Sequence, residues 1–402
     1  MRLLLFMLGR SIKPAVLITV FVSVVSCVML TFCEKGGYVF DKEYDSVFTS
    51  LEADTAYDKV SEMADNTRAQ NDDLAKRAGD YIAAHTKPGS TPPVLPDGLA
   101  GQAVRAAQKG GDSSSAGQSE LYEFMGSSLK DGKESEQLIG DKLSGYKRNA
   151  RRGVTDEYSL ALSAVLTRDY EQVLDNQQLA DKLYDTRAAN TYLEYIENDM
   201  LFFVLIFLIC FSSFSSERQS RRLSAFAITK AGAGRFIFCR IISAGLVCGV
   251  CAVIYCLLQF CVMCLSGGAG CLDMPLQYLK GYALSSYAMS FGGLCIAAVV
   301  LRVLLAEVLC AAMLLLSFLS KRNITAGLIC LAPTAVMIGL SKSDNSTAQF
   351  VTCKFSFLFG GEGYVRVFST PYPVVWLYVL ICAFAAGALF ITLIAQGQRR
   401  EY

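Results

Sequence analysis

The chain has 402 residues, of which 53% are hydrophobic, and its mean hydropathy is +0.37. Its 37 Lys and Arg nearly balance 36 Asp and Glu, yet about 30 of the acidic and only about 19 of the basic residues lie between Glu34 and Asp199. The sequence has one histidine, His85, and no Walker A sequence or zinc-type His/Cys spacing, which argues against an enzyme. Its other basic residues flank apolar runs, which argues against nucleic-acid binding.

The first apolar run, Ala15 to Cys33, is long enough to cross a hydrocarbon core. Arg2, Arg10 and Lys13 precede it, so the positive-inside bias predicts a cytoplasmic N-terminus and a transmembrane helix within residues 1–33. Residues 24–27, Val-Val-Ser-Cys, also resemble the lipobox of a bacterial signal peptide. Because the run continues beyond this sequence, we favour an uncleaved span.

Residues 34–199 form the acidic block, with a net charge near −11, and contain no cysteine. Apolar positions recur at helical spacing from Tyr44 to Ala84 and again from Tyr158 to Ile196, which predicts two long helices. Residues 87–120 are rich in Pro, Gly and Ser and indicate a loop. We therefore predict a large, mainly helical extracellular domain between the first two spans.

Residues 200–402 contain the remaining apolar runs, which are Met200–Phe214, Phe236–Leu265, Tyr287–Leu319, Ile324–Leu340 and Pro373–Ala395. The run at 287–319 fits either two short spans or one long helix. One helix keeps Lys321, Arg322 and the basic C-terminal end in the cytoplasm, so the charge rule favours it. The prediction is an all-α membrane protein with six transmembrane helices, a five-helix membrane domain at 200–402 and both termini cytoplasmic.

Arg302 and Glu307 interrupt the long fourth run, where an ionisable group costs several kcal/mol unless it is paired or hydrated. Their spacing of five residues is not that of a helical i,i+4 pair, so each needs its own partner. Two interpretations stay open: a polar element that faces a translocation path, or a pair of residues with structural partners only.

Most of the 15 cysteines lie in apolar runs. Five of them fall close together, at positions 248, 251, 256, 261 and 264, but no histidine is nearby, and packing explains them better than a metal cluster. Cys271 and Cys353 both fall in predicted outer loops, so a disulfide between them is an open alternative.

The segment at 216–235 joins the second and third spans. Arg218, Arg221 and Arg222 cluster near its start, whereas Leu223 and Phe226 share one helical face. This pattern is typical of a short amphipathic helix at the membrane surface. We expect the helix to be cytoplasmic and to be broken by Gly232 and Gly234 before the third span.

Glu217, the turn Gly234-Arg235, and Arg240 at the start of the third span resemble the coupling-helix region of ABC-2-type permeases of ATP-binding-cassette transporters. The six-span layout with a large first insert is also similar to the ABC-2-like permeases of Gram-positive bacteria. Ser224 departs from the pattern, since a glycine is frequent there. The resemblance covers most of residues 1–33 and 200–402.

The resemblance implies a permease in the bacterial cell membrane that contacts lipid, pairs with a second permease and docks a separate ATPase subunit through residues 216–235. ATP and Mg²⁺ would bind that subunit, so no cofactor is expected in this chain. The expected substrate is a peptide, a lipid-linked molecule or a drug, with export or removal of an antimicrobial peptide or a lipid-linked molecule as the leading case. The alternative is a non-transporting ABC-2-like membrane protein, of the phage-receptor or secretion-accessory type, whose extracellular domain binds partners.

Overall fold

The structure is a computed structural model that describes residues 2–35, 137–149, 156–176, 184, 186–211, 213–216, 232–320, 322–361 and 363–399, with isolated helical positions between 62 and 80. The elements with defined bounds are α1 (Arg2–Lys35), α6 (Glu157–Asn176), α7 (Arg187–Glu197), α8 (Met200–Cys210), α11 (Gly232–Leu265), η1 (Gly268–Cys271), η2 (Leu276–Tyr278), α12 (Phe291–Leu319), α13 (Asn323–Ser341), α14 (Ser346–Val351), α15 (Phe355–Phe359), β1 (Tyr364–Val367), β2 (Thr370–Pro373) and α16 (Val374–Arg399).

Among the described residues, five helices are long and apolar enough to cross a membrane: α1 over Phe6–Thr31, α11 over Gly234–Leu265, the whole of α12 and α13, and α16 over Val374–Gln396. A helix satisfies its own backbone hydrogen bonds, which a lipid environment requires. The described part of the chain is mostly helical and fits a multi-pass membrane protein, as predicted.

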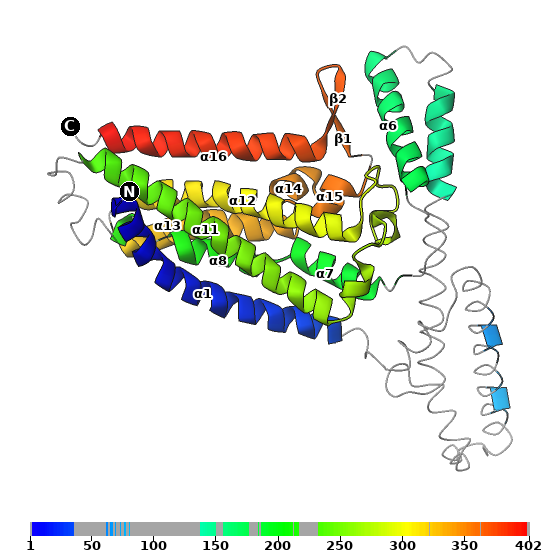
Figure 1. The fold of residues 1–402 in the computed structure, drawn as a ribbon, viewed down its shortest axis with the longest axis horizontal. Helices are drawn as coiled ribbons and strands as arrows, with labels where there is room; N and C mark the ends of the chain where they lie inside the picture. Colours follow the sequence, from blue (N-terminus) through cyan, green and yellow to red (C-terminus); the bar gives the residue numbers. More distant parts are fainter. Residues whose placement is uncertain are drawn as a thin grey trace, which may run out of the picture. The chain divides into compact units, whose positions relative to one another are not determined.

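The apolar helices form a bundle in which α11 and α12 are central. The helix α11 contacts α1, α8, α12 and α16, and α12 contacts α8, α13 and α16 as well. Figure 1 shows these helices side by side, with the first residue of α1 and the last of α16 at the same end of the bundle. A chain that passes through the bundle an even number of times would bring these two residues to the same end.

The fourth apolar run forms one helix, α12, which is unbroken from Phe291 to Leu319. The charge rule therefore selected the correct one of the two alternatives. Ser290 caps the helix, since its side chain accepts a hydrogen bond from the backbone N–H of Gly293. Arg302 and Glu307 both lie well inside α12.

The second predicted span is discontinuous. Its apolar part, α8, has 11 residues, a length of about 16 Å at 1.5 Å per residue, which is roughly half of a hydrocarbon core. The helix α7 precedes it after a break at residues 198–199 and buries Ala188, Ala189, Tyr192, Leu193 and Ile196. The helix α7 packs on α1 and α11.

The chain divides into two compact units: one comprises Met1–Gly37, Ile139–Gln177 and Thr186–Tyr402, the other Tyr38–Leu138 and Gln178–Asp185. The helix α6 belongs to the first unit, where Tyr170 donates a hydrogen bond to the carbonyl of Leu284. Part of the predicted outer domain thus belongs to the unit that holds the apolar helices. The predicted loop at 87–120 lies outside the described residues, and the membrane boundary at residue 199 stays a prediction.

A small non-helical feature precedes α16. The strands β1 and β2 pair antiparallel, with Tyr364 opposite Pro373 and Val367 opposite Thr370. The turn between them places Phe368 at φ 56°, in the left-handed region, with its side chain 93% exposed. The short helices η1, η2, α14 and α15 lie at the same end of the bundle as this hairpin (Figure 1).

Candidate functional site

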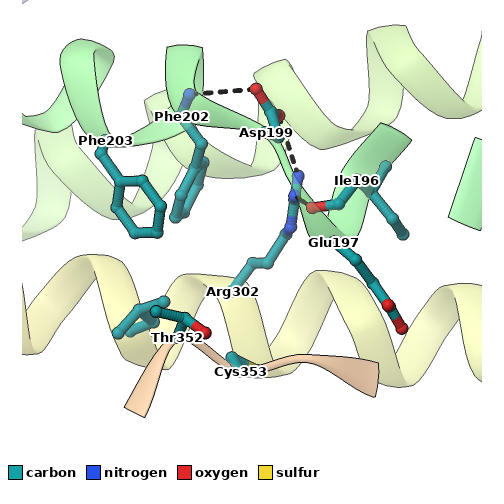
Figure 2. A pocket seen from close by; sticks show the side chains of 9 residues that line it. Ile196, Glu197, Asp199, Phe202, Phe203, Arg302, Thr352 and Cys353 are labelled. Carbon is teal, nitrogen blue, oxygen red and sulfur yellow. Dashed lines mark hydrogen bonds and ion pairs between the residues drawn. The ribbon is translucent and has the colours of Figure 1, made fainter. Parts of the chain in front are cut away.

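Arg302 lies inside the bundle and is 6% exposed. Its Nη1 donates to Asp199 Oδ2 at 3.3 Å and to Gln259 Oε1 at 3.2 Å, and its Nη2 donates to the carbonyl of Ile196. The guanidinium also lies over the ring of Phe202, 5.0 Å from its centroid. Figure 2 shows the guanidinium pointing from α12 toward the break between α7 and α8. The planar fork of arginine suits this set of partners.

Asp199 occupies the break itself, as the N-cap residue of α8, and its side chain is fully buried. Its Oδ1 accepts a hydrogen bond from the backbone N–H of Phe202 at 3.3 Å, and Gln259 Nε2 donates to its Oδ2 at 2.8 Å. The hydroxyl of Tyr255 lies 2.9 Å from both carboxylate oxygens. A carboxylate at a helix N-terminus also interacts favourably with the helix dipole.

The network extends to α1 through Ser26. Its Oγ lies 2.9 Å from the hydroxyls of Tyr195 and Tyr255 and accepts from Gln259 Nε2 at 2.8 Å. Side chains of α1, α7, α8, α11 and α12 are therefore joined by one set of polar contacts. A buried ion pair that is hydrogen-bonded on all sides fixes the mutual positions of the elements that supply it.

The cavity beside this network is small. It has a volume of about 10 Å³, enough for a single water molecule. Its walls come from the α7–α8 break, from α12 and from Thr352 and Cys353. The arrangement brings a buried charge pair together and joins helices that are distant in the sequence.

Glu307 differs from Arg302. It is half-buried, and its carboxylate lies against α11, with Oε2 and Oε1 at 3.0 and 2.9 Å from the positions that a Cβ would take on Gly245 and Gly249. Within the described ranges, no hydrogen bond or ion pair reaches its carboxylate. The two glycines leave the space that the side chain occupies.

The predicted coupling residues are only partly described. Glu217, Arg218, Arg221, Arg222 and Phe226 lie outside the described residues. The helix α11 begins at Gly232 and includes both Gly232 and Gly234, whereas residues 217–231, which would form the predicted amphipathic helix before this point, lie outside the described residues. Glycine is tolerated in the first turn of α11, because the apolar residues that follow stabilise the helix. Arg235 is exposed, whereas Arg240 is buried.

Both ends of this segment are fixed to the bundle. Arg240 donates through Nη1 to Ser11 Oγ at 2.6 Å and through Nη2 to the carbonyl of Ser213 at 3.2 Å. Ser317 Oγ accepts hydrogen bonds from the backbone N–H groups of Phe214 and Ser215 at 3.1 and 3.2 Å. These contacts tie the residues that flank the segment to α1, α11 and α12.

The opposite end of the bundle has its own polar contacts. Glu197 accepts from the backbone N–H and the hydroxyl of Ser356, at 2.6 and 2.9 Å, and from the hydroxyl of Tyr282 at 3.2 Å. Cys271 and Cys353 are both buried with free thiols, so the structure has no disulfide between them. Burial raises the pKa of the Cys353 thiol to about 12, which keeps it protonated.

Sequence analysis identified Arg302 but none of its partners. Asp199 was assigned to the end of the acidic domain. Tyr255 and Gln259, spaced four residues apart in an apolar run, carried a usable signal, because two polar groups on one face of a membrane helix indicate a buried polar partner.

A scan against protein-family models, a search of curated proteins and a search of solved structures find no match to this chain.

Proposed function

We propose that the chain is the permease subunit of an ABC-2-type ATP-binding-cassette transporter, in which a separate ATPase subunit hydrolyses ATP and a second permease completes the complex. Its layout supports the proposal. Counting α7 and α8 together as one crossing, the bundle has six crossings, and the two chain ends lie at the same end of it (Figure 1). With the positive-inside bias, that end is the cytoplasmic face of a bacterial cell membrane.

The observation that carries the proposal is the attachment of the segment between α8 and α11. Arg240 binds Ser11 of α1 and the carbonyl of Ser213, and Ser317 of α12 holds the backbone after α8. A displacement of the segment would therefore be transmitted to α1, α11 and α12 through these hydrogen bonds. ATP-driven closure of an ATPase pair against residues 216–235 would use this connection to move spans two and three.

The substrate path would lie between two permeases, because the described helices of one chain pack directly on each other and the cavity beside Arg302 has room for only about one water molecule. Several helices have wide apolar faces that this chain leaves exposed, such as Leu17 and Phe21 of α1 and Trp376 and Phe384 of α16. Such faces can be covered by lipid or by a second copy of the chain. A path lined by them would favour an apolar cargo such as a lipid-linked molecule, an antimicrobial peptide or a drug.

Charge reversal in the segment tests the proposal. Glu217→Lys and Arg235→Glu should leave the protein in the membrane but weaken ATPase docking by roughly 30-fold, because a reversed charge in a desolvated contact costs about 2 kcal/mol or more. The measurements are co-purification of an ATPase subunit from detergent extract and substrate-stimulated ATP hydrolysis.

The matched control is Lys147→Glu, which reverses an exposed charge paired with Glu171 at 2.7 Å. It should keep both measurements at the wild-type level. If the segment variants behave like this control, residues 216–235 are an ordinary inner loop. If no ATPase co-purifies even with the wild type, the alternative is favoured: a non-transporting membrane protein whose outer domain binds partners.

A further inference from the structure

Three buried cysteines from three different helices meet inside the bundle. Cys210 is the last residue of α8, Cys248 lies near the middle of α11, and Cys310 lies in α12. Their sulfur atoms all lie within 4.8 Å of one another, and none of the side chains is more than 1% exposed. All three thiols are free.

This spacing is close to that of a metal-thiolate centre. With a metal–sulfur distance of about 2.3 Å, sulfur ligands lie about 3.8 to 4.0 Å apart in tetrahedral or trigonal geometry. The three sulfurs would have to approach one another by at most about 1 Å, which small χ1 changes supply. Soft thiolate ligands select d10 cations.

We propose that Cys210, Cys248 and Cys310 form a binding site for a thiophilic divalent d10 cation of the Zn(II) class. On binding, each thiol releases its proton to solvent and its sulfur forms a bond to the cation. A divalent ion with three thiolates carries a charge of −1, whereas a monovalent ion carries −2. Since the surroundings are apolar, the smaller residual charge favours the divalent ion.

Glu307 is the ionisable residue nearest to this site. It lies one helical turn before Cys310, and its Oε1 lies 2.9 Å from the position that a Cβ would take on Gly249, the residue after Cys248. Because a divalent cation with three thiolates already carries a charge of −1, we expect Glu307 to border the loaded site in its neutral form.

The site would join α8, α11 and α12. The inference does not rest on the proposed transport function, because a metal centre here would stabilise the bundle whatever the protein does. Its failure would leave the ATPase-docking experiment unaffected.

Cd(II) is the probe, because it binds thiolates with a near-ultraviolet charge-transfer absorption. The purified full-length protein in detergent, reduced and metal-stripped, is titrated with Cd(II) in the presence of a competing chelator. We expect one tightly bound equivalent in the wild type. Each of Cys210→Ser, Cys248→Ser and Cys310→Ser should weaken binding by about 100-fold or more. Glu307→Gln, which keeps a neutral side chain beside the site, should bind Cd(II) like the wild type.

The matched control is Cys251→Ser, which removes a buried thiol one turn further along α11. It should bind Cd(II) like the wild type. Retention of the tight equivalent in the three serine variants, or loading by Cu(I) but not by Cd(II), would overturn the proposal. X-ray absorption of the Cd(II)-loaded wild type tests the site without any variant, so it stays informative if the serine variants fail to fold. Three sulfur ligands are expected, and fewer than three would also overturn the proposal.

Discussion

Arg302 and Glu307 lie five residues apart in one apolar helix, but their surroundings are opposite. Arg302 has a carboxylate, an amide, a backbone carbonyl and an aromatic ring around its guanidinium. Glu307 rests against two glycines of α11 and has no polar partner among the described residues. Two ionisable residues in the same membrane helix thus need separate explanations. Arg302 holds neighbouring helices together, whereas the side chain of Glu307 stays available for a ligand.

The largest expected effect follows from removing Arg302. The Arg302→Met variant leaves the fully buried Asp199 without its cation, which should lower the free energy of unfolding by about 3 to 5 kcal/mol. Thermal unfolding in detergent measures the loss. The control is Arg235→Met, an exposed arginine, for which we expect little change.

The double variant Asp199→Asn/Arg302→Met sharpens this test, because it removes both charges at once. It should be more stable than the single Arg302→Met variant, since no unpaired charge stays buried. A single variant that unfolds within about 1 kcal/mol of the wild type would show that the pair does not fix the bundle.

A smaller effect is expected for Tyr255→Phe. The hydroxyl of Tyr255 lies 2.9 Å from the Asp199 carboxylate and from Ser26 Oγ, so its removal deprives buried groups of a hydrogen bond, at a cost of about 1 to 2 kcal/mol. Tyr372→Phe, at a 40% exposed position in β2, is the control. Equal unfolding temperatures for the two variants would argue that the network is weaker than its geometry indicates.

The smallest effect is expected for Glu307→Gln, which keeps the shape of the side chain. Because no described hydrogen bond or ion pair is lost, the metal-free protein should stay within about 0.5 kcal/mol of the wild type in thermal unfolding. A loss comparable to that of Arg302→Met would mean that Glu307 has a structural partner and would remove the contrast between the two residues.

The sequence predicted the long apolar helices well, because each coincides with an apolar run. Charge placement also identified α12 as a single helix despite Arg302. The single helix predicted from Tyr158 to Ile196 was wrong, because this stretch forms two separate helices, α6 and α7. The contact of α7 with the apolar helices was also missed, since Glu194 and Glu197 made α7 look like part of the acidic domain. In the structure, α7 turns its apolar side to α1 and α11, whereas Glu194 is exposed.

Contacts between distant residues could not be predicted from one sequence. The partners Asp199 and Arg302 are separated by 103 residues. The same limit applies to the three cysteines, because only Cys248 belonged to the group noted in the sequence and its neighbours come from α8 and α12. Spacing along a chain reports on one helix at a time, so sites assembled from several helices need the tertiary structure.

The break between α7 and α8 has a consequence for biosynthesis. The ribosome completes Asp199 103 residues before Arg302, which at 5 to 20 residues per second is an interval of roughly 5 to 20 s. During that time the carboxylate of Asp199, at the N-cap of an apolar helix of 11 residues, lacks the cation that pairs with it in the folded chain. The ion pair that joins α8 to α12 can therefore form only after both α11 and α12 have been synthesised.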